Sequence, residues 1–206
     1  FVSCPLSNLV LGGTQSIEDL TTGYDTLQKK YGVRLVRGEA QTIDAAARQV
    51  RLANGDEFTA KHILIATGGR PFVPAIPGAD LAVTSNEMFH LDALPKRALV
   101  VGGGYIASEF ACILNGLGVD VTQYYRGAQI LRGFDDEARG HVANAMAAHG
   151  VAIHCGTDVE RLERRAGGIC AIATDGSERE FDLVLYATGR VPNVAGLGLD
   201  HLGVAL

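Results

Sequence analysis

Three consecutive glycines near the middle of the chain constrain its fold more than any other feature. Residues 102–107 read GGGYIA and fit the pattern G-x-G-x-x-A. An apolar run at residues 98–101 precedes them, and residues 105–117 follow with apolar side chains at helical spacing. A strand that passes through such a turn into a helix is typical of a doubly wound sheet. The pattern therefore predicts a strand, a tight turn and a helix in this order.

The small residues of this motif have separate physical roles. Gly102 permits the tight turn, Gly104 lets a pyrophosphate approach the backbone, and Ala107 lets the helix pack closely on the strand. The N-terminus of the helix presents free N–H groups and the positive end of its dipole to that phosphate. We therefore expect the turn to bind a dinucleotide.

The end of the following strand, predicted at Val119–Tyr125, indicates which dinucleotide binds. NAD-specific proteins of this fold place an acidic residue there, where it binds the ribose 2′-hydroxyl. Here Tyr125 is followed by Arg126, and Arg132 lies six residues further on. Two guanidinium groups can bind a 2′-phosphate, which an acidic residue would repel. The sequence thus favours NADPH over NADH, with a pair of solvated loop arginines as the alternative.

An internal repeat organises the chain into two copies. Each copy begins with a hairpin signal, Asn-Gly at residues 54–55 and Asp-Gly at residues 175–176. Each continues into an apolar run that ends in Ala-Thr-Gly, within residues 63–70 and 183–190. The interval from the turn glycine to the threonine, 55 to 67 and 176 to 188, is 12 residues in both copies. Two-residue turns and buried strands are expected in each, so the repeat predicts two nested nucleotide-binding units.

The other patterns complete an α/β protein with a parallel sheet and helices on its faces. Residues 134–149 fit a second helix with an acidic first turn, which Gly150 ends, and residues 151–155 fit the next strand. Three prolines within residues 71–77 predict an extended connector between domains. The apolar residues expected to face the core from the first helix are Ile106, Phe110, Ile113, Leu114 and Leu117.

Composition and charge argue against several function classes. The net charge of −5 argues against a nucleic-acid surface. No apolar run reaches the roughly 18 residues of a membrane span, and no signal peptide opens the chain. Because the chain begins in mid-pattern, we expect its true N-terminus to be missing. The sequence predicts no nucleic-acid or membrane partner and a cytoplasmic location.

The four cysteines show no C-x-x-C spacing. Cys170 lies in the apolar run 169–173, which favours core packing in a reducing compartment. Cys112 lies off the apolar stripe of its helix and has no expected redox role. His154 and Cys155 are adjacent and would point to opposite faces of a strand, so no metal site is expected.

From about residue 58 onward the sequence resembles the glutathione reductase branch of the pyridine nucleotide-disulfide oxidoreductases. The segments that carry the resemblance are ILIATGGRP (63–71), VVGGGYIASEF (100–110), RGAQILRGFDD (126–136) and ATGRVPN (187–193). The resemblance implies two nested Rossmann-like units. These would be a partial FAD-binding domain at residues 1–72, a complete NAD(P)H-binding domain at 73–191 and a return toward the FAD domain at 192–206.

The resemblance also implies a set of site residues. Tyr105 would be the ring that covers the nicotinamide pocket and moves aside when the cofactor enters. Glu109, one turn further along the helix, would bond the carboxamide and orient hydride transfer to flavin, unless it is an ordinary solvent-facing glutamate. Thr67 and Gly68 would lie against FAD. Besides the motif residues named above, the residues that would contact NADPH are Gly103, Ile106, Glu109, Arg126, Arg132 and Gly189.

The first 55 residues fit this resemblance less well. Phe1–Gly13 look more like the flavoprotein subunit of flavocytochrome c sulfide dehydrogenase, in which a cysteine matching Cys4 belongs to a redox disulfide. The C-x-x-x-x-C disulfide, the N-terminal FAD glycine motif and the C-terminal dimerisation domain of glutathione reductases have no counterpart in these 206 residues. We therefore expect this chain alone to be inactive toward disulfides.

Three functional hypotheses follow. The first is an FAD-dependent oxidoreductase that takes hydride from NADPH to flavin and on to a disulfide, most like glutathione-disulfide reductase and a homodimer when intact. The second is a sulfide-oxidising flavoprotein with Cys4 in its sulfur chemistry, which would not need the two arginines. The third is a stand-alone NADPH-binding module without catalysis.

Overall fold

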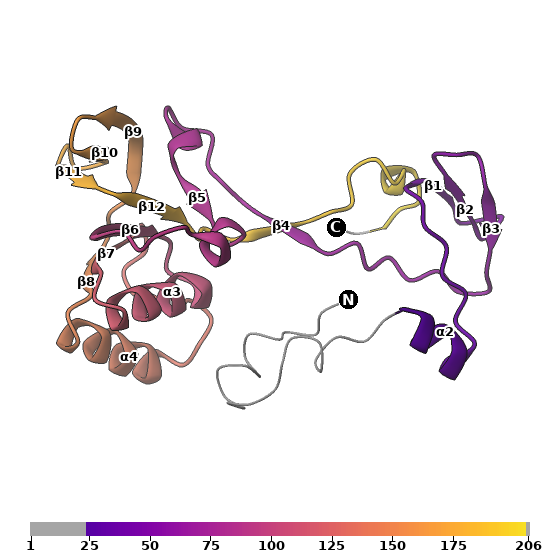
Figure 1. Cartoon of the computed structure of the whole chain (residues 1–206), viewed down its shortest axis with the longest axis horizontal. Helices are drawn as coiled ribbons and strands as arrows, with labels where there is room; N and C mark the ends of the chain where they lie inside the picture. Colours follow the sequence, from indigo (N-terminus) through magenta and orange to yellow (C-terminus); the bar gives the residue numbers. More distant parts are fainter. Residues whose placement is uncertain (1–23, 205–206) are drawn as a thin grey trace. The chain divides into compact units, whose positions relative to one another are not determined.

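A computed structural model describes residues 24–204 of the chain, which forms two compact units (Figure 1). The larger unit spans Ala66–Asn193. The smaller unit joins the described residues before Ala66 to those after Asn193. The domain limits expected from the sequence, near residues 72 and 191, stay a prediction.

A five-stranded parallel sheet forms the centre of the larger unit. Its strands, in spatial order, are β5 (Val83–Thr84), β12 (Leu183–Tyr186), β6 (Arg97–Val101), β7 (Asp120–Tyr125) and β8 (Ala152–Cys155). The chain moves outward from β6 through β7 to β8 and later returns to place β12 on the other side of β6. Strand order therefore reverses beside β6. Doubly wound sheets bind ligands at such a switch point, beyond the carboxyl ends of the strands.

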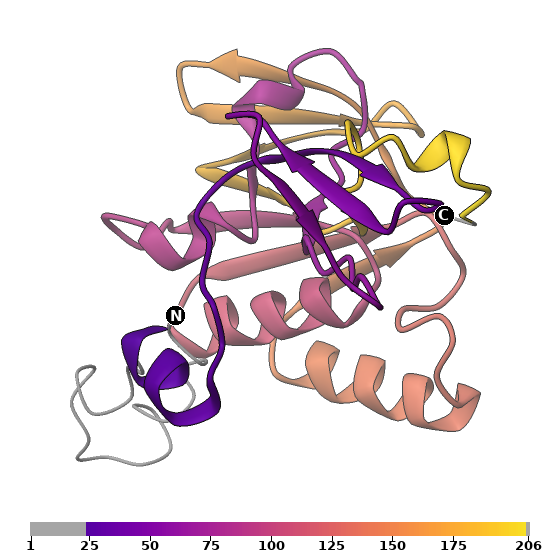
Figure 2. The same ribbon diagram turned by 90° about the vertical axis from the view of Figure 1, so that its right-hand side faces the viewer.

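Both faces of this sheet are covered, as Figures 1 and 2 show. Helices α3 (Tyr105–Gly116) and α4 (Asp136–Ala148) lie on one face, and the antiparallel strands β9 (Val159–Arg165), β10 (Gly168–Ala173) and β11 (Glu178–Phe181) on the other. Ala98 and Val100 pack in the helix-side core, while Leu99 and Val101 pack in the core under the antiparallel strands. Because neighbouring residues of β6 serve both cores, its sequence is continuously apolar.

The core-facing stripe expected on α3 is wrong in part. Ile113 and Leu117 are 54% and 58% exposed. The helix faces the sheet with Leu114 and Ala107, as expected, and also with Ala111; both alanines are 0% exposed. Small side chains let the helix axis approach the strands closely, so the buried stripe follows the alanines. The pattern of large apolar residues pointed to a neighbouring face of the same helix.

The two hairpins of the repeat are confirmed, but their turns differ from the expectation. In the smaller unit β1 (Ala40–Asp44), β2 (Gln49–Leu52) and β3 (Glu57–Thr59) form an antiparallel sheet that matches β9–β11 in design. The turns close with Leu52 N–H donating to the Asp56 carbonyl and Ala173 N–H to that of Ser177, at 2.9 Å each, and so contain three residues. Only the last residue of each, Gly55 (φ +88°) or Gly176 (φ +82°), has positive φ. The Asn and Asp residues keep ordinary backbone angles, as in three-residue loops that end in a left-handed glycine.

The buried strand expected in the first copy is absent, whereas the second copy forms it. Residues 63–66 are not a strand, and Leu64 is 89% exposed. Their counterpart β12 is buried between β5 and β6. Among the described residues no strand pairs with 63–66, so the apolar run has no sheet to join. The smaller unit also contains α2 (Tyr24–Tyr31) and a 3-10 turn at Leu199–His201.

The tight packing around Gly102 predicts a large stability cost for a side chain there. Gly102 has φ +138°, and a Cβ on it would lie 2.3 Å from the Ala187 carbonyl oxygen. Gly102→Ala should lower the free energy of unfolding by roughly 2–4 kcal/mol, measured by urea denaturation followed by circular dichroism.

Gly104→Ala is the matched control for this substitution. Gly104 has φ −83°, and a Cβ on it would meet nothing within 4 Å. Gly104→Ala should lower the free energy of unfolding by less than about 1 kcal/mol, the cost of alanine at a helix N-cap. Equal losses for both variants would refute the close approach as their cause.

Candidate functional site

The glycine turn connects the end of β6 to the start of α3. Gly102 continues the sheet, since its N–H donates to the Tyr124 carbonyl at 2.9 Å. Gly104 is the residue before the first turn of α3, is exposed, and receives no side-chain cap. The first N–H groups of a helix have no partner within it. Open space beside Gly104 and these free donors lie together at the switch point of the sheet, an arrangement that can accept an anion.

Tyr125 explains why the central residue of the turn is also glycine. A Cβ on Gly103 would lie 2.4 Å from the Tyr125 ring, and one on Gly127 would lie 2.6 Å from it. The ring therefore packs between two glycine backbones. The sequence identified Tyr125 only as the position where an acid is missing, because a packing contact across two loops leaves no local signal.

The loop between β7 and α4, residues 126–135, brings both predicted arginines to one place and is called the arginine loop below. Arg126 and Arg132 are exposed and line a shared open pocket of about 630 Å³. The complete set of lining residues is Tyr125, Arg126, Gly127, Ala128, Gln129, Arg132, Asp136 and Arg139. Arg139 was not identified from the sequence, since it lies on α4, beyond the motif. Its charge makes the pocket more positive, with Asp136 as the one acid among the lining side chains.

A backbone hydrogen bond joins the glycine turn to this arginine loop. The Leu131 N–H donates to the Gly103 carbonyl at 2.5 Å. Leu131 has φ +58°, a left-handed conformation that is strained for a branched side chain. Arg132 follows directly. The two motifs are therefore held as one site at the carboxyl ends of β6 and β7.

The other predicted site residues lie on α3, which begins directly after this turn. Tyr105 is the first residue of α3 and is 56% exposed. Glu109 is exposed one turn later, Ile106 is half-buried, and Ala107 is fully buried against the sheet. Tyr105 and Glu109 are thus free to contact a ligand above the turn.

Thr67, Gly68 and Gly189 belong to a different place, a two-stranded ribbon of β4 (Gly69–Pro71) and β13 (Arg190–Pro192). The Thr67 hydroxyl donates to the Asn193 carbonyl at 2.5 Å. Gly68 (φ +73°) and Gly189 (φ +131°) both have left-handed backbones, and a Cβ on either would meet nothing within 4 Å. Each glycine is therefore open on the side where a Cβ would stand, while its carbonyl accepts a hydrogen bond within the ribbon.

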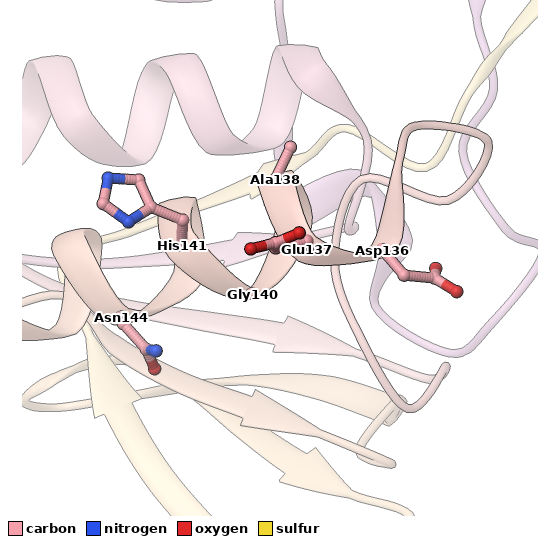
Figure 3. A pocket seen from close by; sticks show the side chains of 6 residues that line it. All are labelled: Asp136, Glu137, Ala138, Gly140, His141 and Asn144. Atoms are coloured by element: carbon pink, nitrogen blue, oxygen red, sulfur yellow. The ribbon is translucent and has the colours of Figure 1, made fainter.

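A second hollow lies over the exposed side of α4 (Figure 3). Glu137, His141 and Asn144 project from this one helix and do not converge on a common point (Figure 3). The hollow shares only Asp136 with the arginine pocket. It therefore has no arrangement of side chains that would support catalysis.

Three of the four cysteines lie in the described part of the chain. Cys170 is 0% exposed, and Cys112 and Cys155 are exposed free thiols. Cys4 lies outside the described residues. Within residues 24–204 no group of three or more His, Cys, Asp or Glu side chains is placed to hold a metal ion. No helix in that range is long and apolar enough to cross a membrane.

Curated relatives match nearly the whole chain. Glutathione reductase from Burkholderia cepacia is 42% identical over 200 residues, covering 97% of this chain and 44% of the relative. The Nostoc enzyme is 44% identical over 179 residues, covering 85% and 38%. The chloroplastic/mitochondrial enzyme of Pisum sativum is 39% identical over 199 residues, covering 96% and 36%. The match therefore extends into the first 55 residues, and the chain spans less than half the length of these relatives.

Solved structures and the family pattern agree with these relatives. LpdA from Mycobacterium tuberculosis is 30% identical with a TM-score of 0.75, covering 88% of this chain and 42% of that one. The flavoprotein disulfide reductase RclA from Escherichia coli is 25% identical with a TM-score of 0.75, covering 89% and 42%. An engineered water-forming NADPH oxidase bound to NADPH is 27% identical with a TM-score of 0.72, covering 95% and 46%. Since the family model also matches residues 1–206, this chain belongs to the pyridine nucleotide-disulphide oxidoreductase family.

Proposed function

We propose that this chain supplies the NADPH-binding part of an FAD-dependent disulfide reductase, most like glutathione reductase. The observation that carries the proposal is the pocket of Arg126 and Arg132, bonded through Leu131 to the glycine turn. The pyrophosphate would lie beside Gly104 at the N-terminus of α3, and the 2′-phosphate would lie between the two guanidinium groups. The space beside Gly104 fits such a ligand, because a Cβ there meets no protein atom within 4 Å.

The engineered NADPH oxidase provides independent support for the arginine pair. Three of its five substitutions replace an aspartate by alanine, place an arginine at the next position, and place a second arginine six positions after the first. Arg126 and Arg132 have the same spacing, and Tyr125 stands where an acid would precede them. Removing the acid and adding two guanidinium groups changes preference toward a 2′-phosphate for an electrostatic reason.

The other site residues have roles in positioning the cofactors. Tyr105 would cover the nicotinamide pocket, and Glu109 would accept a hydrogen bond from the carboxamide and fix the ring for hydride transfer. The bound nicotinamide and flavin supply the redox chemistry itself. Because Asn193 engages the Thr67 hydroxyl and the backbone carbonyls of Thr67 and Gly68, we assign the FAD contact at these residues to their backbone N–H groups.

The substrate and setting of the whole enzyme belong to the same proposal. Electrons would leave the flavin for a redox disulfide outside these 206 residues and then reduce a small disulfide, with glutathione disulfide as the candidate. The intact enzyme would be a homodimer in the cytoplasm. Free thiols at Cys112 and Cys155 are compatible with a reducing compartment.

Replacement of both pocket arginines tests the 2′-phosphate assignment. Each hydrogen bond to a charged partner is worth roughly 1.5–3 kcal/mol, so Arg126→Ala with Arg132→Ala should weaken NADPH binding by about two to four orders of magnitude. NADH binding should change little, and the NADPH loss should shrink as salt rises. Titration calorimetry on this chain measures both nucleotides.

Arg164→Ala with Arg179→Ala is the matched control, since both arginines are exposed on β9 and β11 and the change in net charge is the same. The control should keep the NADPH preference. Equal losses for NADPH and NADH in the pocket variant would leave only a generic dinucleotide fold.

Glu109→Gln tests the positioning of the nicotinamide in the intact enzyme. Flavin reduction, followed by stopped flow, should slow roughly 10- to 100-fold while the Kd for NADPH changes only a few-fold, because misorientation affects the transfer step most. Glu137→Gln, an exposed glutamate on α4, should change neither quantity. An unchanged reduction rate in Glu109→Gln would make Glu109 an ordinary surface residue.

A further inference from the structure

The arginine loop is fixed to α4 by one largely buried side chain, Arg139. Its side chain is 14% exposed. Nε donates to the Ile130 carbonyl and Nη2 to the Gln129 carbonyl, both at 2.8 Å, while Nη1 pairs with the Asp136 carboxylate. One guanidinium therefore spans two consecutive peptide groups of the loop and the first turn of the helix.

A hydrogen bond from the loop to the helix completes this connection. The Gln129 amide donates to the Asp136 carbonyl at 3.1 Å. Asp135 caps α4 by accepting from the N–H groups of residues 137 and 138 at 3.1 and 3.0 Å. Ile130 is 0% exposed. The loop is thus anchored at residues 129–130, immediately before the strained Leu131 and the exposed Arg132.

The donors of Arg139 are mostly committed within the protein. A guanidinium carries five N–H donors, and three of these are used by the contacts above. The two carbonyls lie close to the pocket, so Arg139 holds the pocket wall. Arg126 and Arg132, by contrast, make no hydrogen bond to a described residue and are exposed to solvent.

We propose that Arg139 is a positioning residue for dinucleotide selectivity: it holds residues 129–131 in the conformation that directs Arg132 toward a 2′-phosphate. This inference rests on the proposed function. It predicts that the selectivity for NADPH depends on the planar, two-sided donor geometry of the Arg139 guanidinium and not on its charge. Lysine keeps the charge but cannot donate to two carbonyls from a planar group.

The test compares Arg139→Lys with the unmodified chain in two measurements. Calorimetry should show NADPH binding weakened roughly tenfold and NADH binding unchanged within about two-fold, since only the 2′-phosphate contact depends on the loop. Hydrogen exchange without nucleotide should become faster in residues 127–132 and stay unchanged in β6 and β7. Gln129→Ala breaks the other connection without changing charge and should shift both measurements in the same direction by a smaller amount.

Arg97→Lys is the matched control. Arg97 also donates to a backbone carbonyl, that of Gly167 at 2.9 Å, and pairs with Asp182 at 2.8 Å, at the opposite end of β6. This control should keep the NADPH preference even where it lowers the melting temperature. It separates the general effect of replacing an arginine that has two partners from the specific effect of replacing Arg139.

Each other outcome overturns the inference. Weaker NADPH binding with unchanged loop exchange in both variants would make Arg139 a direct phosphate ligand. Unchanged NADPH preference in Arg139→Lys would remove the inference and leave the proposed function intact. An unmodified chain that binds NADPH no more tightly than NADH would refute the proposed function, and the selectivity role of Arg139 with it.

Discussion

The close approach of three backbone segments at the glycine turn is the constraint on which the larger unit depends. Gly102 lies against the Ala187 carbonyl at the end of β12, Gly103 against the Tyr125 ring at the end of β7, and the Gly103 carbonyl accepts from Leu131. No side chain fits at the first two points. The third glycine of the turn has a different surrounding, since a Cβ on Gly104 would meet nothing within 4 Å. Gly102 and Gly103 therefore serve packing, while Gly104 leaves the backbone before α3 open.

The charged groups of the predicted site are exposed side chains, whereas the backbone that carries them is held by buried contacts. Arg126 and Arg132 are exposed, so they keep their hydration until a ligand replaces it. The backbone that carries them is bonded to β6 through Gly103 and to α4 through Arg139. A preorganised loop loses little conformational entropy when an anion binds. Under the proposed function, this arrangement would let exposed arginines be selective.

The sequence predicted the elements whose signals are local. The strand, turn and helix around residues 98–116, both hairpins, and a helix near 134–149 with an acidic first turn were predicted from turn residues and residue spacing, although Asp135, expected in that first turn, is the N-cap of α4. The buried face of α3 was predicted only in part: the motif indicated Ala107, whereas Ala111 faces the sheet for a steric reason that apolar spacing does not encode. The same holds for Tyr125 and Arg139, whose partners come from other segments. The strand predicted at residues 63–66 is absent for a third reason: the apolar run has no partner strand among the described residues.

The repeated Ala-Thr-Gly sequence has a structural meaning beyond nucleotide approach. Thr67 donates its hydroxyl to the Asn193 carbonyl, and Thr188 donates its hydroxyl to the Phe72 carbonyl. The acceptors stand at matching positions, since Phe72 follows Thr67 by five residues and Asn193 follows Thr188 by five. The backbone bonds repeat the symmetry: Phe72 N–H donates to the carbonyl of Gly189, and Asn193 N–H donates to that of Gly68, both at 2.9 Å. Residues 67–72 and 188–193, both in the larger unit, therefore bind each other through a ribbon with pseudo-twofold symmetry. The threonine hydroxyls and the glycine carbonyls are thus engaged within the protein, so a nucleotide would meet the N–H groups of Gly68 and Gly189 rather than these acceptors.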